Sequence, residues 1–260
     1  MKLSLKWLGR YVDLAGRDPA EIARDLTLST AEIEGVEPFC AVLDETVVAE
    51  VVACEPHPDA DHLSLCRVAD GGPEPLEVVC GAPNVARGQK VAFARVGTVL
   101  PGGMKLKKAR IRGQRSLGMI LSERELGLSD EHEGIIVLDP AAEPGRPLAT
   151  AIAARDTVLE IDNKSITHRP DLWGHYGFAR ELAAIYDLEL APPTEPVRYP
   201  EEGIRVPIAI EDTDRCPRYL GLVLEGLQVG PAPEWMRWLL TAVGQRPISN
   251  VVDLTNFILL

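Results

Sequence analysis

The residues best suited to do chemistry are the cations of one stretch, residues 81–122. This stretch contains no acidic residue, although acidic residues outnumber basic ones in the whole chain and give it a formal charge of −12. Clustered lysines and arginines bind phosphate groups, so this asymmetry predicts contact with a polyanion such as nucleic acid. The alternative is a solvated basic face without a partner. The cations are Arg87, Lys90, Arg95, Lys105, Lys107, Lys108, Arg110, Arg112 and Arg115.

A second concentration of ligand groups lies in residues 57–62. Two histidines and two aspartates within six residues offer potential metal ligands. However, Pro56 and Pro58 impose an extended loop and no third ligand group lies at zinc spacing, so the pattern favours a structural turn over a metal site. The five cysteines are widely spaced without a CxxC pair, which predicts reduced and mostly buried thiols.

Composition and missing motifs exclude several classes of protein. The sequence has no GxxxxGK[ST] or GxGxxG stretch to hold a nucleotide and no GxSxG hydrolase motif. With 46% hydrophobic and 25% charged residues among 260, the chain is neither disordered nor of low complexity. No apolar run is long enough to span a membrane, and the N-terminus lacks the apolar centre of a signal peptide. We therefore expect a cytoplasmic protein.

The segments that must position the cations are short and β-branched, with glycine and proline between them. They predict a small closed or partly closed β-barrel over residues 39–148. Within residues 105–112, Leu106 and Ile111 are expected to face inward and the cations outward, with a bulge at Lys107 and Lys108. The predicted strands are residues 46–54, 63–69, 76–80, 90–96, 105–112, 118–122 and 134–138.

Helical patterns lie on both sides of this predicted barrel. An N-cap aspartate, a first-turn proline and a capping-box glutamate in residues 18–21 predict a helix. Asp171 is expected to cap a second helix, whose apolar stripe must be buried. We therefore expect residues 1–38 and 149–190 to form one discontinuous α+β domain into which the barrel is inserted. The stripe consists of Leu172, Tyr176, Ala179, Ala183 and Tyr186.

The C-terminal part begins with a proline-rich segment, which is followed by predicted strands and a predicted helix. Residues 191–203 hold four prolines and are expected to form a stiff linker. In residues 204–260, strands are predicted at 204–210 and 219–224, and a helix at 233–243. Because the sequence stops inside an apolar run, we expect an N-terminal fragment of a longer polypeptide.

Seven motifs carry a family resemblance over essentially the whole chain. HPDADHLSLC (57–66), VCGAPNV (79–85), LPGGMKLKKARIRG (100–113) and SLGM (116–119) resemble the OB-fold tRNA-binding domain of several synthetases. The flanking pieces resemble the β subunit of bacterial phenylalanyl-tRNA synthetase. Their motifs are ITHRPDLWGH (166–175), CPRY (216–219) and RPISNVVDLTN (246–256).

This resemblance implies a multidomain α+β fold. The discontinuous N-terminal domain carries an inserted OB-fold β-barrel, and residues 204–260 begin an α/β editing domain. In the family this subunit binds tRNA(Phe) and joins an α subunit in an α2β2 heterotetramer that uses ATP and Mg²⁺. Nothing in the sequence resembles the class II catalytic motifs. These 260 residues alone are therefore not expected to bind ATP or Mg²⁺ or to charge tRNA. The implied tRNA-binding residues are Lys90, Lys105, Lys107, Lys108, Arg110, Arg112 and Arg115.

The resemblance also implies hydrolytic editing of tyrosine attached to tRNA(Phe). An amino-acid pocket built for an aromatic ring rejects an added hydroxyl poorly, so a second site removes the error. By motif position, Arg246 is implied to anchor the tRNA 3′ end or a carbonyl oxygen. Thr255 and Asn256 are implied to bind the amino acid or the hydrolytic water. The alternative for these two is that they satisfy a turn at a strand end.

Two other functions stay open on the sequence alone. One is a non-enzymatic tRNA-binding or RNA-chaperone protein with the same barrel, and the other is a subunit-assembly scaffold. His62 stands where the family usually has lysine or arginine. Phe93 is the only aromatic residue of the basic stretch, so RNA binding is expected to depend on charge and shape and to weaken with salt.

Overall fold

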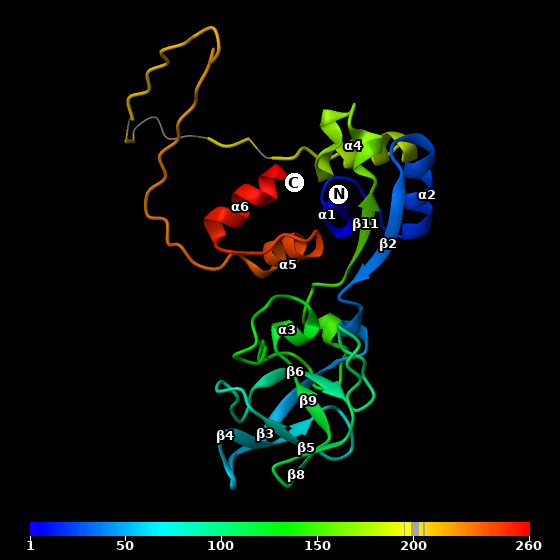
Figure 1. Ribbon diagram of the computed structural model, residues 1–260, viewed down its shortest axis with the longest axis vertical. Coiled ribbons are helices and arrows are strands. Elements are labelled where there is room, and N and C mark those ends of the chain that lie inside the picture. The colour runs from blue at the N-terminus through cyan, green and yellow to red at the C-terminus, as the bar shows by residue number, and fades with distance from the viewer. Residues whose placement is uncertain (195, 199–202, 205) are drawn as a thin grey trace.

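A computed structural model describes residues 1–194, 196–198, 203–204 and 206–260. Its N-terminal sheet is antiparallel with the order β1-β11-β2, so a strand from the second half of the chain lies between two from the start. Figure 1 shows this sheet beside α1, α2 and α4. The elements are β1 (Lys2–Ser4), α1 (Leu5–Leu8), α2 (Pro19–Ser29), β2 (Ile33–Phe39), β11 (Asp156–Ile161) and α4 (His175–Tyr186).

The helix predicted near residue 18 is confirmed as α2. The Asp18 carboxylate accepts a hydrogen bond from the Ala20 backbone N–H at 3.0 Å, which satisfies one of the unpaired donors at the helix start. Ile22 and Leu26 lie one turn apart and are buried in the same core as the apolar face of α4. Local capping and periodicity therefore suffice to place this element.

The predicted cap of the second helix is wrong. α4 begins at His175 with Gly174 as its N-cap. Asp171 lies instead in a short 3₁₀ turn, Pro170–Leu172, where its carboxylate accepts hydrogen bonds from Arg169 and Arg180 side chains. The carboxylate is thus held by two arginine side chains and lies outside the first turn of α4. Most of the predicted apolar stripe is nevertheless buried against α1 and α2.

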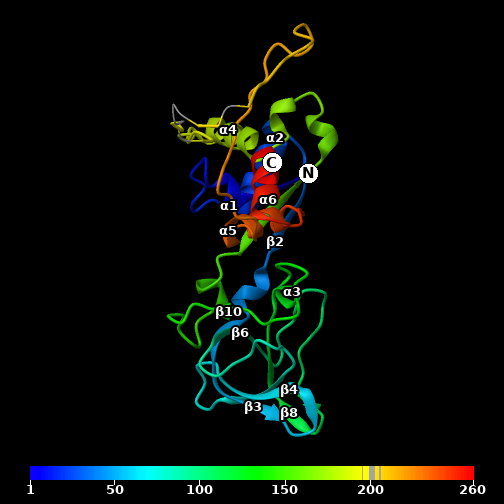
Figure 2. The same ribbon diagram turned by 90° about the vertical axis from the view of Figure 1, so that its left-hand side faces the viewer.

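The second sheet is also antiparallel and has the order β10-β6-β3-β4-β5, with β9 paired to β6 as well. The predicted α+β class is confirmed. No closed barrel forms among the described strands, because the pairing path ends at β5 on one side and at β9 and β10 on the other. Figure 2 shows this sheet at the opposite end of the molecule from α4. The strands of this sheet are β3 (Val47–His57), β4 (Ala60–Ala69), β5 (Leu76–Cys80), β6 (Lys90–Arg95), β9 (Gly118–Ile120) and β10 (Val137–Leu138), and a separate hairpin consists of β7 (Ala109–Ile111) and β8 (Gln114–Ser116).

The single strand predicted over residues 105–112 is wrong. Lys105 forms an isolated bridge with Val99, and β7 pairs only with β8 in a separate two-stranded sheet. The turn between β7 and β8 consists of Arg112 and Gly113, whose φ angles are +47° and +83°. Positive φ at both central residues matches the twist of a tight hairpin. The turn residues therefore divide this stretch, although its apolar and basic positions alternate in part like a strand.

The C-terminal part contains two helices, α5 (Glu234–Ala242) and α6 (Asn250–Leu259). α5 confirms the helix predicted at 233–243. The strands predicted at 204–210 and 219–224 are wrong for the described residues, which form no strand. A strand needs a partner for its backbone groups, and none of the described strands pairs with these segments. Arg205 and part of the predicted linker lie outside the described residues.

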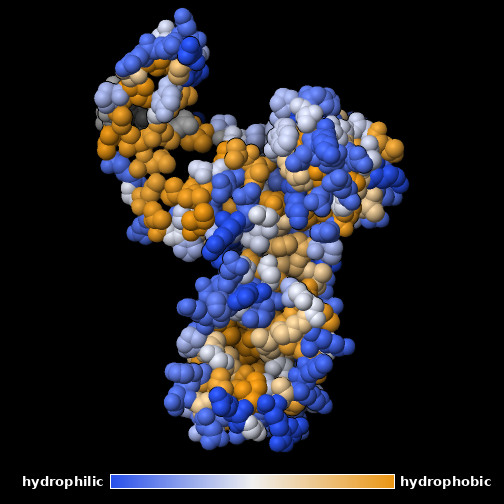
Figure 3. Space-filling view, viewed as in Figure 1, coloured by the Kyte–Doolittle hydropathy of each residue, from blue (hydrophilic) through white to orange (hydrophobic). Residues whose placement is uncertain are grey.

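The segment between the described linker residues and α5 exposes apolar side chains. Figure 3 shows them at the upper left, on an arm that extends away from the helices. Leu220 and Val229 are each 75% exposed. In contrast, α5 and α6 pack against α1 through a cluster that contains Trp7, Met236 and Leu240. No helix within the described ranges is long and apolar enough to cross a membrane.

Candidate nucleic-acid interface

The β7–β8 hairpin presents arginines on both strands and at its turn. Arg110 on β7 lies directly opposite Arg115 on β8, and Arg112 occupies the first turn position. All three side chains are exposed. Like charges directly opposite each other destabilise a β-ribbon, so the hairpin carries an electrostatic cost that a bound anion would relieve.

Three lysines precede the hairpin on a connected loop. The Leu106 backbone N–H donates to Thr98 O and the Gly97 N–H donates to Leu106 O, both at 2.9 Å. These bonds fix the loop while Lys105, Lys107 and Lys108 stay exposed. Together with the three hairpin arginines they form what we call the basic surface. Within the part of the chain that the structure describes, none of its six cations pairs with a carboxylate. The basic surface consists of Lys105, Lys107, Lys108, Arg110, Arg112 and Arg115.

Two other cations of the basic stretch are neutralised. The Lys90 Nζ atom lies 2.5 Å from Glu50 Oε2 on the neighbouring strand β3. Arg95 donates to the buried carboxylate of Asp70 at 2.6 Å. Burial alone would raise the pKa of Asp70, but the hydrogen bonds from Arg95 and from the Gly72 N–H bring that pKa below its ordinary value. The structure thus separates Lys90, a predicted phosphate ligand, from the unpaired cations.

The basic surface lacks an aromatic platform. Phe93, the only aromatic residue of the stretch, is fully buried in the core of the six-stranded sheet. Gly118 on β9 leaves room for its ring, since a Cβ atom there would overlap Phe93. Within residues 81–122, no aromatic ring is therefore exposed beside the six cations for a base to stack on.

The histidine loop forms a turn between β3 and β4 at Pro58 and Asp59. His57 is buried, and its Nδ1 atom accepts a hydrogen bond from the Asp59 N–H at 3.1 Å, which places the ring proton on Nε2. His62 is exposed. Among the residues that the structure describes, no group of three or more histidine, cysteine or acidic side chains is arranged to hold a metal ion.

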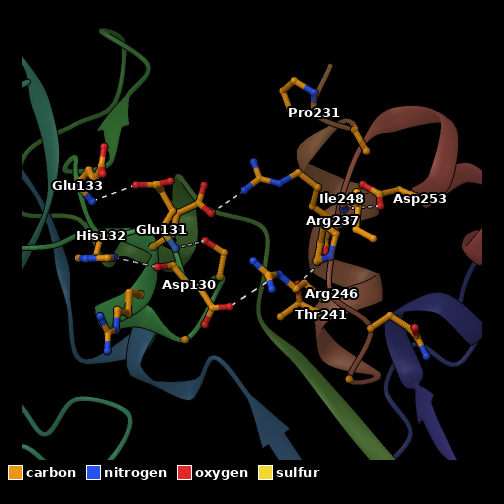
Figure 4. A pocket seen from close by; sticks show the side chains of 18 residues that line it. Asp130, Glu131, His132, Glu133, Pro231, Arg237, Thr241, Arg246, Ile248 and Asp253 are labelled. Atoms are coloured by element: carbon orange, nitrogen blue, oxygen red, sulfur yellow. Dashed lines mark hydrogen bonds and ion pairs between the residues drawn. The ribbon is translucent and has the colours of Figure 1, made fainter. Parts of the chain in front are cut away.

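The predicted editing residue Arg246 lies in a different region, a cavity of about 940 Å³ between the loop after α3 (Glu123–Leu126) and the helices α5 and α6. Figure 4 shows Arg237 and Arg246 pointing from the helical side toward acidic residues on the opposite wall. Arg237 donates to Glu123 at 2.6 Å, and both side chains are about four-fifths buried. Arg246 lies 3.9 Å from Asp130 and both side chains remain largely exposed.

Thr255 and Asn256 are not among the residues that line this cavity with Arg246. Both lie within α6, so the turn at a strand end considered for them does not occur. The Thr255 hydroxyl donates to Val252 O at 2.7 Å, which is ordinary side-chain bonding within a helix. The structure therefore does not assemble the three predicted residues into one site.

Sequence reasoning missed Asp253, which does line the cavity. This residue is 1% exposed, and its Oδ1 atom accepts a hydrogen bond from the Ile248 N–H at 2.7 Å. The second carboxylate oxygen is buried and has no hydrogen-bond partner among the residues that the structure describes. Asp253 thus ties α6 to the short segment that carries Arg246. The sequence signal that could have indicated Asp253 is an acidic residue inside the otherwise apolar run VVDL (251–254).

Two protein-family models match parts of this chain. Residues 46–147 match the family model described as "Putative tRNA binding domain", and residues 215–260 match the B3/4 domain. Among solved structures, the C-terminal domain of Plasmodium vivax p43 covers 38% of this chain and 56% of its own, at 23% identity. Its TM-score of 0.29 is too low to bear on the fold.

Curated relatives match the entire chain. The beta subunit of phenylalanine–tRNA ligase from Oleidesulfovibrio alaskensis is 48% identical over 264 residues, and that from Anaeromyxobacter dehalogenans is 44% identical over 269 residues. Each match covers 100% of this chain and 32% of the relative, so the chain spans about a third of the length of these relatives. The family predicted from the motifs is confirmed in preference to a free-standing RNA-binding protein. The chain belongs to the family of phenylalanine–tRNA ligase beta subunits.

Proposed function

We propose that this chain supplies tRNA binding to a phenylalanine–tRNA ligase, and that the basic surface contacts the tRNA backbone. The observation that carries the proposal is the grouping of six exposed cations without a carboxylate partner among the described residues. Phosphate contacts release counterions and dominate the affinity of such surfaces for nucleic acid. The match of residues 46–147 to a tRNA-binding family model supports the same conclusion.

The hairpin geometry suits phosphate groups. Arg110 and Arg115 lie side by side across the two strands and offer guanidinium groups that bind phosphate oxygens in pairs. A phosphate between them also removes their mutual repulsion. Lys90 is also proposed to contribute, but weakly, because Glu50 already neutralises its ammonium group.

The whole enzyme is proposed to charge tRNA(Phe) with phenylalanine together with an α subunit, in an α2β2 tetramer that uses ATP and Mg²⁺. The names of the curated relatives support the ligase activity. The described residues offer no set of ligands suited to Mg²⁺, so no step of the reaction is assigned to this part of the chain.

Residues 215–260 are proposed to contribute to hydrolytic editing of tyrosine attached to tRNA(Phe). Arg246 is exposed at the edge of the cavity and is proposed to hold the tRNA 3′ end or a carbonyl oxygen of the aminoacyl ester. Thr255 and Asn256 are proposed to offer hydrogen-bond groups to the amino acid or to the hydrolytic water. The match to the B3/4 domain supports the assignment.

The six-stranded sheet with its hairpin is proposed to be a partly closed OB-type barrel inserted into a discontinuous domain made of residues 1–38 and 149–190. In the strand order, β5 and β9 are not paired with each other. Two hydrogen bonds between β5 and residues just before β9 support a partly closed barrel. The Leu117 N–H donates to Glu77 O at 2.8 Å, and the Val79 N–H donates to the Ser116 hydroxyl at 3.3 Å. These bonds join β5 to the last residue of β8 and to Leu117, which follows it.

The experiment that tests tRNA binding reverses charges on the basic surface. In the 260-residue chain, Lys105, Lys107 and Lys108 are changed together to glutamate, and affinity for unmodified tRNA(Phe) is measured at low salt. We expect affinity to fall by at least about tenfold, because three phosphate contacts become repulsive. The exposed positions leave the fold intact, which a thermal unfolding curve verifies.

A matched control separates the loss of the basic surface from the change in net charge of the chain. Arg24, Lys164 and Arg215 are exposed cations outside the basic stretch, and their joint change to glutamate alters net charge equally. We expect this control to lose much less affinity. Equal losses in the two triple variants, or no loss in the first, would show that the basic surface is not the tRNA contact.

A further inference from the structure

Two cysteines face each other across the β3–β4 ladder. Cys54 on β3 pairs in register with Cys66 on β4, and their Sγ atoms lie 3.9 Å apart. Directly opposed residues of an antiparallel pair have Cα atoms roughly 4.5–5.5 Å apart. This separation falls inside the range of about 4.4–6.8 Å that a disulfide requires. Bond formation therefore needs side-chain rotation and little movement of the strands.

The local backbone gives these side chains some freedom. The register of the ladder shifts between Val51 and Ala53, and again between Pro56 and His57. Cys54 therefore lies in a short regular piece between two irregularities of β3. Bulges locally disrupt a ladder and increase its twist, so small adjustments of this piece do not disturb the rest of the sheet.

The two thiols differ in access to solvent. Cys54 is half-buried, and its thiol donates weakly to Val85 O at 3.9 Å. Cys66 is 2% exposed, and burial raises the pKa of its thiol well above the ordinary value. A small oxidant dissolved in water therefore meets Cys54 first, while Cys66 is held in contact as the second thiol.

We propose that Cys54 and Cys66 form an oxidation site, at which a peroxide converts the two thiols into a cross-strand disulfide. The Cys54 thiol releases its proton, the thiolate attacks one oxygen of hydrogen peroxide, the O–O bond breaks, and the departing hydroxide takes up the released proton, so that the sulfenic acid and one water result. The Cys66 sulfur then attacks the Cys54 sulfur, its proton passes to the departing hydroxyl, and a second water leaves. The two thiols lose two electrons and the peroxide gains them.

A third cysteine lies close but is placed differently. Cys80 on β5 stands opposite Ser64, two residues away from Cys66, so it faces no cysteine across the ladder. Burial also raises the pKa of its thiol. The disulfide is therefore assigned to Cys54 and Cys66, and Cys80 stays reduced.

The test uses the chain after full reduction and removal of the reductant. It is exposed to hydrogen peroxide, free thiols are alkylated under denaturing conditions, and peptides are identified by mass spectrometry. We expect one disulfide-linked pair of peptides, containing Cys54 and Cys66, and alkylation of the other three of the five cysteines. Dithiothreitol restores all five free thiols.

Serine variants supply the controls. Cys54→Ser and Cys66→Ser are each expected to abolish the linked pair, whereas Cys40→Ser and Cys216→Ser leave it unchanged. The small change of a thiol to a hydroxyl is checked by thermal unfolding. A link that involves Cys80, or oxidation of Cys54 to sulfinic acid with Cys66 still free, would overturn the proposal.

Discussion

The indole ring of Trp7 lies stacked on the imidazole of His175, with ring centroids 3.9 Å apart and an interplanar angle of 15°. The Trp7 ring also stacks on Phe257 of α6, with ring centroids 4.4 Å apart. Two backbone groups fix the imidazole. The Ser4 N–H donates to Nε2 at 3.1 Å, so Nδ1 carries the proton and donates to Leu260 O at 2.7 Å. This stack joins α1, α4 and α6.

The buried imidazole predicts loss of stability in acid. Burial lowers the pKa of His175 to about 4, although the bond to Leu260 O favours the charged form. As pH falls from 6.5 to about 4, the unfolded chain binds a proton that the folded chain does not, so the free energy of unfolding falls. The maximum loss is about 3 kcal/mol. Denaturant titrations across this range measure it.

A neutral variant isolates the histidine from other titrating groups. His175→Gln is expected to be less stable than the parent at pH 7 and to show a flatter dependence on pH. Asp156 has a pKa raised by burial and acts in the opposite direction, but it is present in both proteins. The same change at exposed His132 serves as a control and should leave the stability at pH 7 close to that of the parent. An unchanged slope in His175→Gln contradicts the account.

Asp253 is predicted to stabilise the segment that carries Arg246. Asp253→Ala removes the acceptor of the Ile248 N–H and is expected to lower the free energy of unfolding by about 1–3 kcal/mol. Asp253→Asn keeps a carbonyl oxygen in the same place and should cost clearly less. Chemical denaturation of the two variants provides the comparison. Equal losses would mean that the carboxylate charge, and not this hydrogen bond, matters.

The two ion pairs across the cavity are predicted to differ in strength. A double-mutant cycle on Arg237 and Glu123, each changed to glutamine, should give a coupling free energy of about 1–2 kcal/mol, because both groups are largely buried. The same cycle on Arg246 and Asp130 should give a value near zero, because both side chains are exposed and 3.9 Å apart. A larger coupling for the second pair would refute this ranking.

Close packing at β9 predicts that Gly118 tolerates no side chain. A Cβ atom there would lie 2.8 Å from Ala94 O and would overlap Phe93. Gly118→Ala is therefore expected to lower stability by about 1–3 kcal/mol. Gly230 has open space around it, so Gly230→Ala serves as the control and should be close to neutral. Thermal unfolding of both variants decides the point.

Local signals explain what could be predicted from the sequence. Capping and spacing placed α2, and a β-branched run between turns placed β5 at residues 76–80 as observed. The β7–β8 hairpin was missed because Arg112 adopts a positive φ that favours glycine or asparagine. Predicted strands at 204–210 and 219–224 had suitable residues but no partner strand among the described residues.

Contacts between distant residues could not be predicted in this way. Ser4 and His175 are separated by 171 positions, and no local pattern indicates that their backbone and ring nitrogens meet. The pairing of Lys90 with Glu50 likewise depends on the register of β3 and β6. Sequence reasoning therefore found the basic stretch but not which of its cations are free.

The most direct test of tRNA binding by the basic surface is the salt dependence of its affinity for tRNA(Phe). If its six cations contact phosphates, the logarithm of the association constant falls with the logarithm of salt concentration with a slope of about −4 to −5. Changing Lys105, Lys107 and Lys108 to glutamine should reduce this slope by about 2 to 3. A slope that stays the same in this variant, or binding that does not respond to salt, would contradict the account.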